Sequence, residues 1–400
     1  MRELLLESFH AAVAAADPLQ ILPAHLPRAP RGRVFVAAAG KAAASMAVAA
    51  EKHYPAIEGI AITRYGHGLP TRSIRVVEAG HPVPDAAGEA AARELFSRVK
   101  ELREDDLLLA LLSGGGSSLL AFPIEGLAMA ELKKLTAQLL KSGATIQEIN
   151  TVRKHLSAIQ GGRLAAACRA EVMALIVSDV TGDDPTHIAS GPCTPDPTTI
   201  DDARAVLAKY RIDFRGPFSE SPKPGDPAFG RTTNSVIATA YRSLEAAAEV
   251  FRRRGIAPVI LGDTITGEAR EVAQDMALLA RRAPRPAALI SGGECTVTVG
   301  GQGGRGGRCA EFLLALALEL DGVPNAWGIA ADTDGIDGSE DNAGALMTPD
   351  SLGRAAAKGL DAMALLWKND SYGFFSALGD LVVTGPTRTN VNDYRAILLA

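Results

Sequence analysis

Residues 106–120 read DLLLALLSGGGSSLL, in which six apolar residues lead into Ser113, three consecutive glycines and two serines. A short apolar run that stops at a glycine-rich turn is typical of a buried parallel strand, and a long helical region is predicted after the loop. The segment therefore predicts the strand-turn-helix unit of a parallel α/β sheet.

The same pattern occurs four more times in the first half of the chain. VFVAAAG at 34–40 predicts a strand that ends at Gly40, with a helix over about 42–53, and a further helix is expected over 86–101. The other strand candidates are GIAITRYG (59–66), IRVVEAG (74–80) and VMALIVSD (172–179). Strands alternating with helices at this spacing predict a Rossmann-like, doubly wound α/β/α domain. Ligands bind at the carboxyl ends of such strands, so we expect four residues to meet at one edge: Gly40, His81, Ser113 and Asp179.

A chain of 400 residues is long enough for two hydrophobic cores. The most linker-like stretch is 214–233, which is rich in Pro, Gly and Ser. Beyond it the pattern restarts with a helix predicted over 236–253 and strands at PVILG (258–262) and AALISGG (287–293). We therefore predict an α/β domain over 1–230 and a smaller α/β domain over 231–400.

Composition excludes several classes of protein. The net charge is −5 and no long basic run occurs, which disfavours nucleic acid or an acidic membrane as the main partner. The four cysteines show no C-x-x-C spacing, which favours a reducing cytoplasm over a disulfide or zinc scaffold. The N-terminal 18 residues predict an amphipathic helix rather than a signal peptide, and no apolar stretch has the length of a membrane span. A homo-oligomer is one of the oligomeric states that the sequence allows.

The glycine loop after residue 112 has the composition of an anion-binding turn. A run of glycines costs backbone entropy and lets the chain approach another group closely. A helix that begins after Ser117 would point free N–H groups at the loop and favour an anion. A tight strand-helix turn is the alternative, and the loop matches neither common nucleotide fingerprint. The candidate binding residues of this loop are Ser113, Gly114, Gly115, Gly116, Ser117 and Ser118.

Three further side chains are candidates for the same edge. Lys41 directly follows the strand-ending Gly40, where the helix dipole disfavours a cation unless it faces a bound anion. An exposed lysine is the alternative. His81 lies in the turn HPVPD (81–85), and Arg153 lies in the basic stretch NTVRKH (150–155).

A second glycine cluster covers residues 300–308 and carries Arg305 and Arg308 just before an apolar helix predicted from about Cys309. Arginine in a glycine-rich loop at a helix start suits phosphate binding and stabilisation of a transferring charge. Gly307 and Arg308 are therefore candidates for a phosphate site, with a flexible hairpin as the alternative.

Acidic residues follow two predicted strands. Asp179 and Asp183 lie in SDVTGDD, while Asp332, Asp334 and Asp337 lie in DTDGIDG. One or two of these carboxylates are candidates for Mg²⁺, which keeps several waters and bridges phosphate oxygens, and another could orient a hydroxyl. A helix cap or turn former is the better expectation for most of them. The histidines lack i, i+4 metal-ligand spacing, and no G-x-S-x-G elbow occurs.

Taken in order, nine segments resemble the glycerate 2-kinase family that includes the MOFRL domain, named from tartrate-utilisation and serine-cycle proteins. They are AGKAAASM (39–46), AGHPVPD (79–85), LLSGGGSSLL (111–120), NTVRKHLSAIQGGRLA (150–165), SDVTGDDPTHIASGPCTPDPTT (178–199), SGGECTVTV (291–299), GGRCAE (306–311), DTDGIDG (332–338) and GPTRTNVND (385–393). The resemblance implies an ATP- and Mg²⁺-dependent kinase that converts D-glycerate to 2-phosphoglycerate. It also implies a Rossmann-like N-terminal domain, a smaller MOFRL domain and an active site in the cleft between them.

The family's active-site Lys and Arg carry over to Lys41 and Arg308. The resemblance then suggests that glycerate's carboxylate sits on the 113–118 amides or Lys41, and that Asp179 positions the metal or the hydroxyl. Asp179, Asp183 and Asp334 are the metal candidates. The chain departs from the family pattern at two places, where Cys309-Ala310 replaces a polar, amide-bearing pair and Arg388 replaces a glycine. Both lie beside motifs expected to line the cleft.

Two other functions stay open on sequence grounds. Hydroxypyruvate reductase is a name that some family members have carried, and it needs a nicotinamide site, but AAAGKAAASM (37–46) has a single glycine and no dinucleotide fingerprint. A non-catalytic anion-binding protein on the same scaffold is the second alternative.

Overall fold

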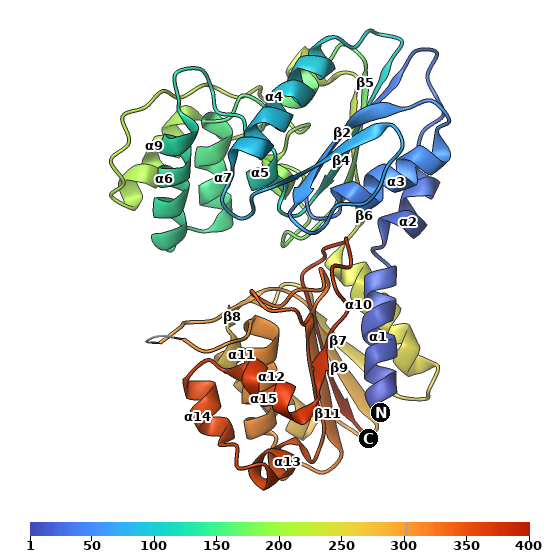
Figure 1. Ribbon diagram of the computed structural model, residues 1–400, viewed down its shortest axis with the longest axis vertical. Coiled ribbons are helices and arrows are strands. Elements are labelled where there is room, and N and C mark those ends of the chain that lie inside the picture. The colour runs from blue at the N-terminus through green and yellow to red at the C-terminus, as the bar shows by residue number, and fades with distance from the viewer. Residues whose placement is uncertain (301–302) are drawn as a thin grey trace. The chain divides into compact units, whose positions relative to one another are not determined.

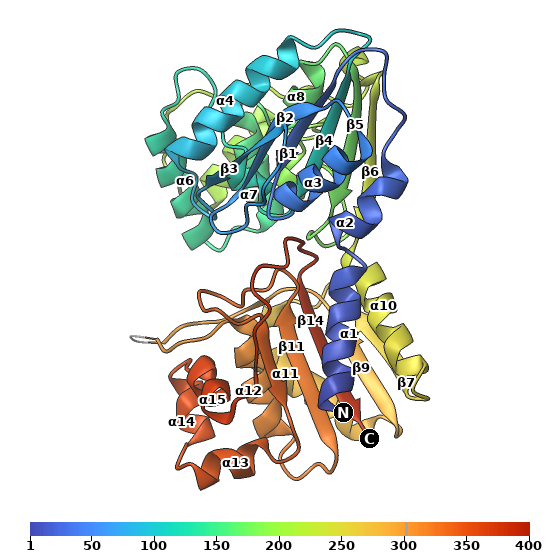
Figure 2. The same cartoon turned by 45° about the vertical axis from the view of Figure 1, so that its right-hand side comes forward.

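The computed structural model describes residues 1–300 and 303–400, so Gly301 and Gln302 of the predicted phosphate loop lie outside the described residues. The described chain forms two compact units. The N-terminal unit is Pro18–Ile237, and the C-terminal unit consists of Met1–Asp17 and Ala238–Ala400. Figures 1 and 2 show the helices and strands of each unit in two views.

The N-terminal unit is built on a six-stranded sheet with the order β3-β2-β1-β4-β5-β6. Its strands are β1 (Val34–Ala39), β2 (Glu58–Arg64), β3 (Ile74–Ala79), β4 (Leu107–Ser113), β5 (Glu171–Val177) and β6 (Thr232–Ala238). Strands β1 to β5 pair in parallel. All residues of β1 and β4 are buried, which requires cover on both faces of the sheet. The predicted doubly wound α/β fold is confirmed.

Helices supply that cover. Helix α4 (Ala86–Lys100) packs on the face shared by Phe35, Ala37 and Ala39, and α3 (Ala43–His53) contacts β1, β2 and β4. Helices α6 (Met129–Lys141), α7 (Ile146–His155) and α9 (Ile200–Lys209) share a separate small core. The remaining short helices are α2 (Pro18–Ile21), η1 (Leu22–His25), α5 (Gly116–Leu119), α8 (Arg163–Ala166), η2 (Ile188–Ser190) and η3 (Pro227–Phe229).

Two predictions near residue 230 need correction. The helix predicted over 236–253 begins only at Ala240, because the side chain of Thr239 accepts the amide N–H of Arg242 and caps it. The residues before it form β6 and complete the first sheet. The stretch 214–233 is not a free linker: Ser221 Oγ donates to buried Asp196, and the amide of Ser219 donates to the carbonyl of His155. These bonds tie the stretch to the N-terminal unit, so the units divide after Ile237 rather than at 230.

The C-terminal unit has a mixed six-stranded sheet with the order β13-β12-β11-β14-β9-β7. Its strands are β7 (Ala257–Gly262), β9 (Ala287–Ser291), β11 (Ala326–Asp332), β12 (Gly344–Met347), β13 (Leu381–Val382) and β14 (Asp393–Leu399). Only β7 and β9 pair in parallel among these described strands. Strands β8 (Gly267–Glu268) and β10 (Cys295–Thr296) form a separate short ladder.

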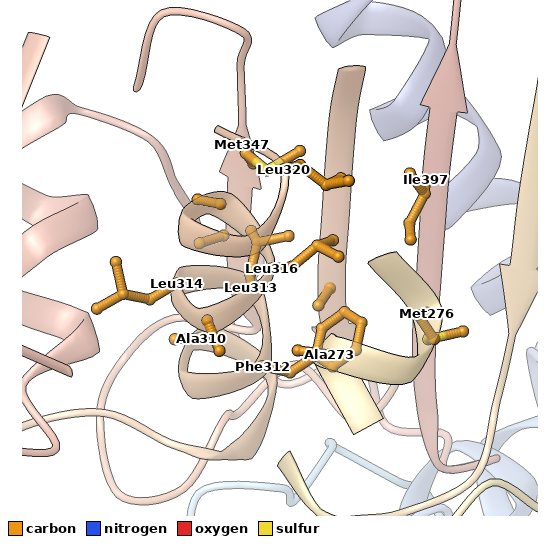
Figure 3. Close-up of a cluster of buried hydrophobic side chains, with 14 of the residues drawn as sticks. Ala273, Met276, Ala310, Phe312, Leu313, Leu314, Leu316, Leu320, Met347 and Ile397 are labelled. Carbon is orange, nitrogen blue, oxygen red and sulfur yellow. The ribbon is translucent and has the colours of Figure 1, made fainter. Parts of the chain in front are cut away.

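One face of this sheet packs against α11 (Ala269–Arg282) and α12 (Arg308–Glu319). Figure 3 shows this core, in which Phe312 and Leu316 of α12 lie near Met276 of α11 and Ile397 of β14. Helices α13 (Ser351–Ala357), α14 (Ala362–Trp367) and α15 (Ser371–Leu378) flank α12. Within the described residues, no helix is long and apolar enough to cross a membrane.

The first helix, α1 (Arg2–Ala14), lies beside α10 (Ala240–Arg252) on the opposite face of the C-terminal sheet (Figures 1 and 2). Phe9 of α1 is fully buried there, in the same core as Phe251. The hydroxyl of Tyr394 donates to Ser8 Oγ at 2.8 Å. The predicted division at 1–230 placed this helix in the other domain, because an apolar helix face does not reveal which sheet it covers.

Candidate active site

The turns that follow β1 and β4 contact each other, as expected because these two strands are parallel neighbours in the sheet. The amide of Lys41 donates to the carbonyl of Gly114 at 2.8 Å, and the amide of Ala42 donates to Ser113 Oγ at 3.0 Å. Gly40 has a φ of +129°, and a Cβ on it would lie 2.1 Å from Ser113 Oγ. A glycine is therefore required here by both backbone conformation and space.

The next turn brings His81 and Lys41 to Gly115. Gly115 has a φ of +81°, and a Cβ there would lie 2.9 Å from His81 Nε2 and 3.4 Å from the Cγ of Lys41. A Cβ on Gly116 would lie 2.5 Å from the Cβ of Ala189. Close packing on both sides thus accounts for part of the glycine run, and it places Lys41, His81 and the loop together.

The surroundings of His81 are cationic. Burial lowers the pKa of His81 to about 3, and the charges of Lys41, Arg64, His67 and Arg153 act in the same direction. The imidazole is therefore neutral at physiological pH. A neutral histidine surrounded by cationic side chains is suited to a bound anion that offsets their charge.

Arg153 is the most informative of these cations. Burial lowers the pKa of its guanidinium to about 10. Among the residues that the structure describes, none forms a hydrogen bond or ion pair with this side chain. By contrast, the guanidinium of Arg163 donates to the carbonyls of Lys154, Gln160 and Ser219. A half-buried guanidinium that no described protein group uses is available to bind a carboxylate or phosphate.

The serines of the loop are largely used inside the fold. Ser190 Oγ donates to Ser117 Oγ at 2.8 Å, and Ser118 Oγ donates to the carbonyl of Gly115 at 3.1 Å. A cavity of about 20 Å³ lies beside Arg153 and is lined by Ser117 and Ser118. Helix α5 is a single turn rather than the longer helix expected after Ser117. The helix N-terminus that was predicted to bind an anion therefore belongs to one helical turn.

Asp179 and Asp183 follow β5 in the same unit, and both are partly buried. Asp183 has a φ of +54°, and its amide donates to the carbonyl of Val180 at 3.0 Å, so it forms a turn. The described residues contain no group of three His, Cys, Asp or Glu side chains arranged to hold a metal ion.

In the C-terminal unit, Arg308 begins α12 and lies at the centre of three carboxylates. Its Nη2 donates to Asp332 at 2.6 Å, its Nε to Asp393 at 2.9 Å, and its Nη1 lies 3.3 Å from Glu294. Burial opposes the charge of Arg308, but these carboxylates raise its pKa well above the ordinary value. Arg308 is therefore a fully charged, rigidly oriented donor.

Asp337 and Asp334 have structural partners that match the turn and cap expectation. Asp337 accepts the amides of Cys309 and Ala310 at the start of α12, and burial raises its pKa to about 7. Asp334 accepts the amide of Ile336 at 2.8 Å. A Cβ on Gly307 would lie 2.2 Å from Asp337 Oδ1, so this glycine is needed for close approach of the two segments.

Several residues of these two sites were not predicted from sequence. Arg64 ends β2, and its position at the carboxyl end of a strand was a usable signal. Asp393 and Glu294, which pair with Arg308, lie in two of the segments that resemble the family, but their proximity to Arg308 is created by the pairing of distant strands.

The two folds define a two-unit α/β protein, with a cluster of cationic side chains around His81 in the N-terminal unit and an arginine held among carboxylates in the C-terminal unit. Comparison with known proteins agrees. Residues 4–219 match the family model described as Domain of unknown function (DUF4147), and residues 287–393 match the MOFRL family. The chain belongs to the glycerate 2-kinase family with a MOFRL domain.

Individual relatives cover nearly the whole chain. D-glycerate 2-kinase of Thermotoga maritima is 39% identical, with 98% of this chain and 97% of that protein covered. A crystal structure of glycerate kinase from the same organism superposes with a TM-score of 0.88 at 38% identity, covering 100% and 99% of the two chains. A protein of Agrobacterium vitis named putative hydroxypyruvate reductase is 50% identical, with 100% and 94% covered.

Proposed function

We propose that this chain is an ATP-dependent glycerate 2-kinase that transfers the γ-phosphoryl group of ATP to the 2-hydroxyl of D-glycerate, giving 2-phosphoglycerate and ADP. The observation that carries the proposal is the half-buried guanidinium of Arg153, which has no partner among the described residues, beside Lys41 and neutral His81. This cluster fits a small anion such as a carboxylate. The Thermotoga relative named D-glycerate 2-kinase supports the choice of substrate.

The residues present also fit Mg-ATP. Gly304, Gly306 and Gly307 line a cavity of about 240 Å³ together with Arg308, so backbone and a charged donor are available to a triphosphate. Mg²⁺ is usually held by one or two carboxylates plus phosphate oxygens rather than by a protein cage. This coordination is compatible with one or two carboxylate ligands supplied by Asp179, Asp183 or Asp334. When bound, ATP would supply the phosphoryl group, and Mg²⁺ would neutralise the negative charge that develops on this group during transfer.

Each protein group then has a defined task. Arg153 and Lys41 bind and orient the carboxylate of glycerate. His81 hydrogen-bonds the substrate as a neutral imidazole, since a pKa of about 3 makes it a poor base. Arg308 stabilises charge on the transferring group, and Asp179 positions the hydroxyl or the metal. The free thiols of all four cysteines support a cytoplasmic location.

The reductase alternative is less well supported. In a sheet of order 3-2-1-4-5-6, a dinucleotide pyrophosphate binds the N-terminal amides of the helix after β1. Here the amide of Lys41 donates to Gly114, that of Ala42 to Ser113, and that of Ala43 to the carbonyl of Gly40. The chain's own atoms therefore already use the donors that such a cofactor needs.

One assay separates the kinase, the reductase and a non-catalytic anion-binding protein. The purified chain is mixed with D-glycerate and either Mg-ATP or NADP⁺, and with hydroxypyruvate and NADPH. We expect ADP release only with glycerate and Mg-ATP, and ³¹P NMR should identify 2-phosphoglycerate rather than the 3-isomer. Cofactor turnover without ADP release would establish the reductase instead, and glycerate binding without any turnover would establish the anion-binding protein.

A further inference from the structure

The N-terminal unit contains a small cavity beside Arg153. It is lined by residues of α5, α6 and α7 and of the segment that follows α7, and its volume is about 20 Å³. One water needs about 10–15 Å³ of such space. The cavity therefore has room for a group about the size of one hydroxyl and is too small for a carboxylate or a phosphoryl group.

Gln160 lines this cavity and offers an acceptor to it. Its Nε2 donates to the carbonyl of Ser117 at 2.8 Å and to the carbonyl of Leu120 at 3.1 Å. Because carbonyls only accept, these two bonds identify the nitrogen end of the amide and leave Oε1 for a ligand. Across the described part of the chain, Oε1 has no hydrogen-bond partner. Gln160 is only 2% exposed, and a buried acceptor in this condition favours a ligand that donates to it.

Thr136 of α6 supplies a hydroxyl to the same cavity and is 4% exposed. A threonine inside a helix can donate to the carbonyl four residues earlier, as Thr151 Oγ1 does to the carbonyl of Gln147 at 3.0 Å. Thr136 Oγ1 makes neither this bond nor any other hydrogen bond to a residue that the structure describes. A hydroxyl can both donate and accept, so Thr136 can donate to a group that itself donates to Gln160.

The rest of the lining, apart from Arg153, needs no hydrogen bond from a ligand. Its serines already have hydrogen-bond partners within the fold: Ser117, Ser118 and Ser157. Its other residues are apolar: Pro84, Ala121, Phe122 and Leu132. A hydroxyl carried on an apolar carbon therefore matches this cavity, whereas a methyl group would leave the polar atoms of Gln160 and Thr136 without partners.

We propose that this cavity is the subsite for the 3-hydroxyl group of D-glycerate, which donates to Gln160 Oε1 and accepts from Thr136 Oγ1. The hydroxymethyl group of glycerate is attached to the carbon that bears the carboxylate, so Arg153 can hold the carboxylate while the hydroxyl enters the cavity. A hydroxyl in a space of about 20 Å³ cannot receive a phosphoryl group, so the 2-hydroxyl is left to react. The inference rests on the proposed function and names the residues that select the substrate and the hydroxyl that is spared.

The test compares the binding of D-glycerate with that of D-lactate, in which a methyl group replaces the hydroxymethyl group. Calorimetric titrations of the full chain, with and without Mg²⁺ and a non-hydrolysable ATP analogue, require no phosphoryl transfer. We expect the unaltered chain to bind D-lactate about 10–100-fold more weakly, because Gln160 and Thr136 are then left without partners. Thr136→Val removes the hydroxyl and keeps a side chain of similar shape. Thr151→Val is the matched control, since it removes a buried hydroxyl that already donates within its own helix.

In Thr136→Val the preference for D-glycerate should fall about 3–10-fold, the effect of one hydrogen bond, while the control keeps the full preference. Equal binding of the two acids by the unaltered chain would overturn the proposal without any variant, because the cavity would then hold only water. An equal loss of affinity for both acids in Thr136→Val, or failure of D-glycerate to bind in either condition, would also overturn it. If the preference changes as expected but D-glycerate and Mg-ATP release no ADP, the subsite is retained and only the proposed kinase activity is refuted.

Discussion

Arg308 donates through Nε to both carboxylate oxygens of Asp393, at 2.9 and 3.1 Å, and so joins the first residue of α12 to the first residue of β14. Asp393 is 1% exposed in its side chain, and burial raises its pKa. The arginine therefore neutralises a buried carboxylate in addition to the role we propose in phosphoryl transfer. A substitution of Arg308 must separate these two effects.

We expect Arg308→Lys to fold and to lose turnover by about 10³-fold or more, because a lysine keeps the charge but not the fork of donors. Arg308→Ala should also destabilise the fold by about 3–5 kcal/mol, since it leaves Asp332 and Asp393 buried without their partner. The measurements are kcat and the free energy of unfolding in urea. Arg305→Lys is the matched control, because this arginine of the same loop is exposed and pairs with Glu340. Near-normal kcat in folded Arg308→Lys would refute the role.

Arg153→Met should raise the KM for D-glycerate by about 10–100-fold, the effect of losing a charged hydrogen bond to the carboxylate. Its free energy of unfolding without substrate should change little, because the side chain is half-buried and makes no hydrogen bond or ion pair to a described residue. Arg163→Met is the control: it removes three hydrogen bonds to carbonyls and should lower the melting temperature with little effect on KM. A lower melting temperature in Arg153→Met and a higher KM in Arg163→Met would instead assign the structural role to Arg153.

The stability of the protein should fall as the pH decreases from about 6.5 towards 3, in part because of His81. Its pKa is about 3 in the folded chain and 6.5 when unfolded, so between these values the unfolded state binds the extra proton. Urea unfolding at pH 4.5 and 7.5 should show a smaller difference for His81→Gln than for the unaltered chain. His10→Gln, at an exposed position of α1, should leave the difference unchanged. If both variants behave alike, His81 is not held neutral by its surroundings.

Phe9→Ala should destabilise the C-terminal unit by about 3–5 kcal/mol, the usual cost of a large cavity at a fully buried aromatic site. Hydrogen exchange of the full chain should then show loss of protection in 238–400. Phe35→Ala, at a buried site of β1, should give the converse loss in 18–237. Protection lost only in 18–237 in the Phe9 variant would contradict the assignment of α1 to the C-terminal unit.

Local sequence patterns were sufficient to predict the parallel sheet. β1 and β4 are continuous apolar runs closed by glycine or serine, and both lie where the sequence predicted them. Parallel strands bring their carboxyl ends to one edge, which is why the contact of Gly40 with Ser113 could be anticipated from spacing alone. The site's position between the two domains stays a prediction.

Non-local packing accounts for what the sequence did not reveal. An isolated apolar helix face is the same whichever sheet it covers, so the place of α1 depended on its fit to α10 and β14. Likewise, residues become ion-pair partners or remain unpaired only when distant segments meet. The amino-acid pattern thus established the strands, glycine turns and candidate cations, whereas the folded chain distinguished Arg308, surrounded by carboxylates, from Arg153, half-buried without one. The physical reason is that burial and charge compensation depend on neighbours far away in the chain.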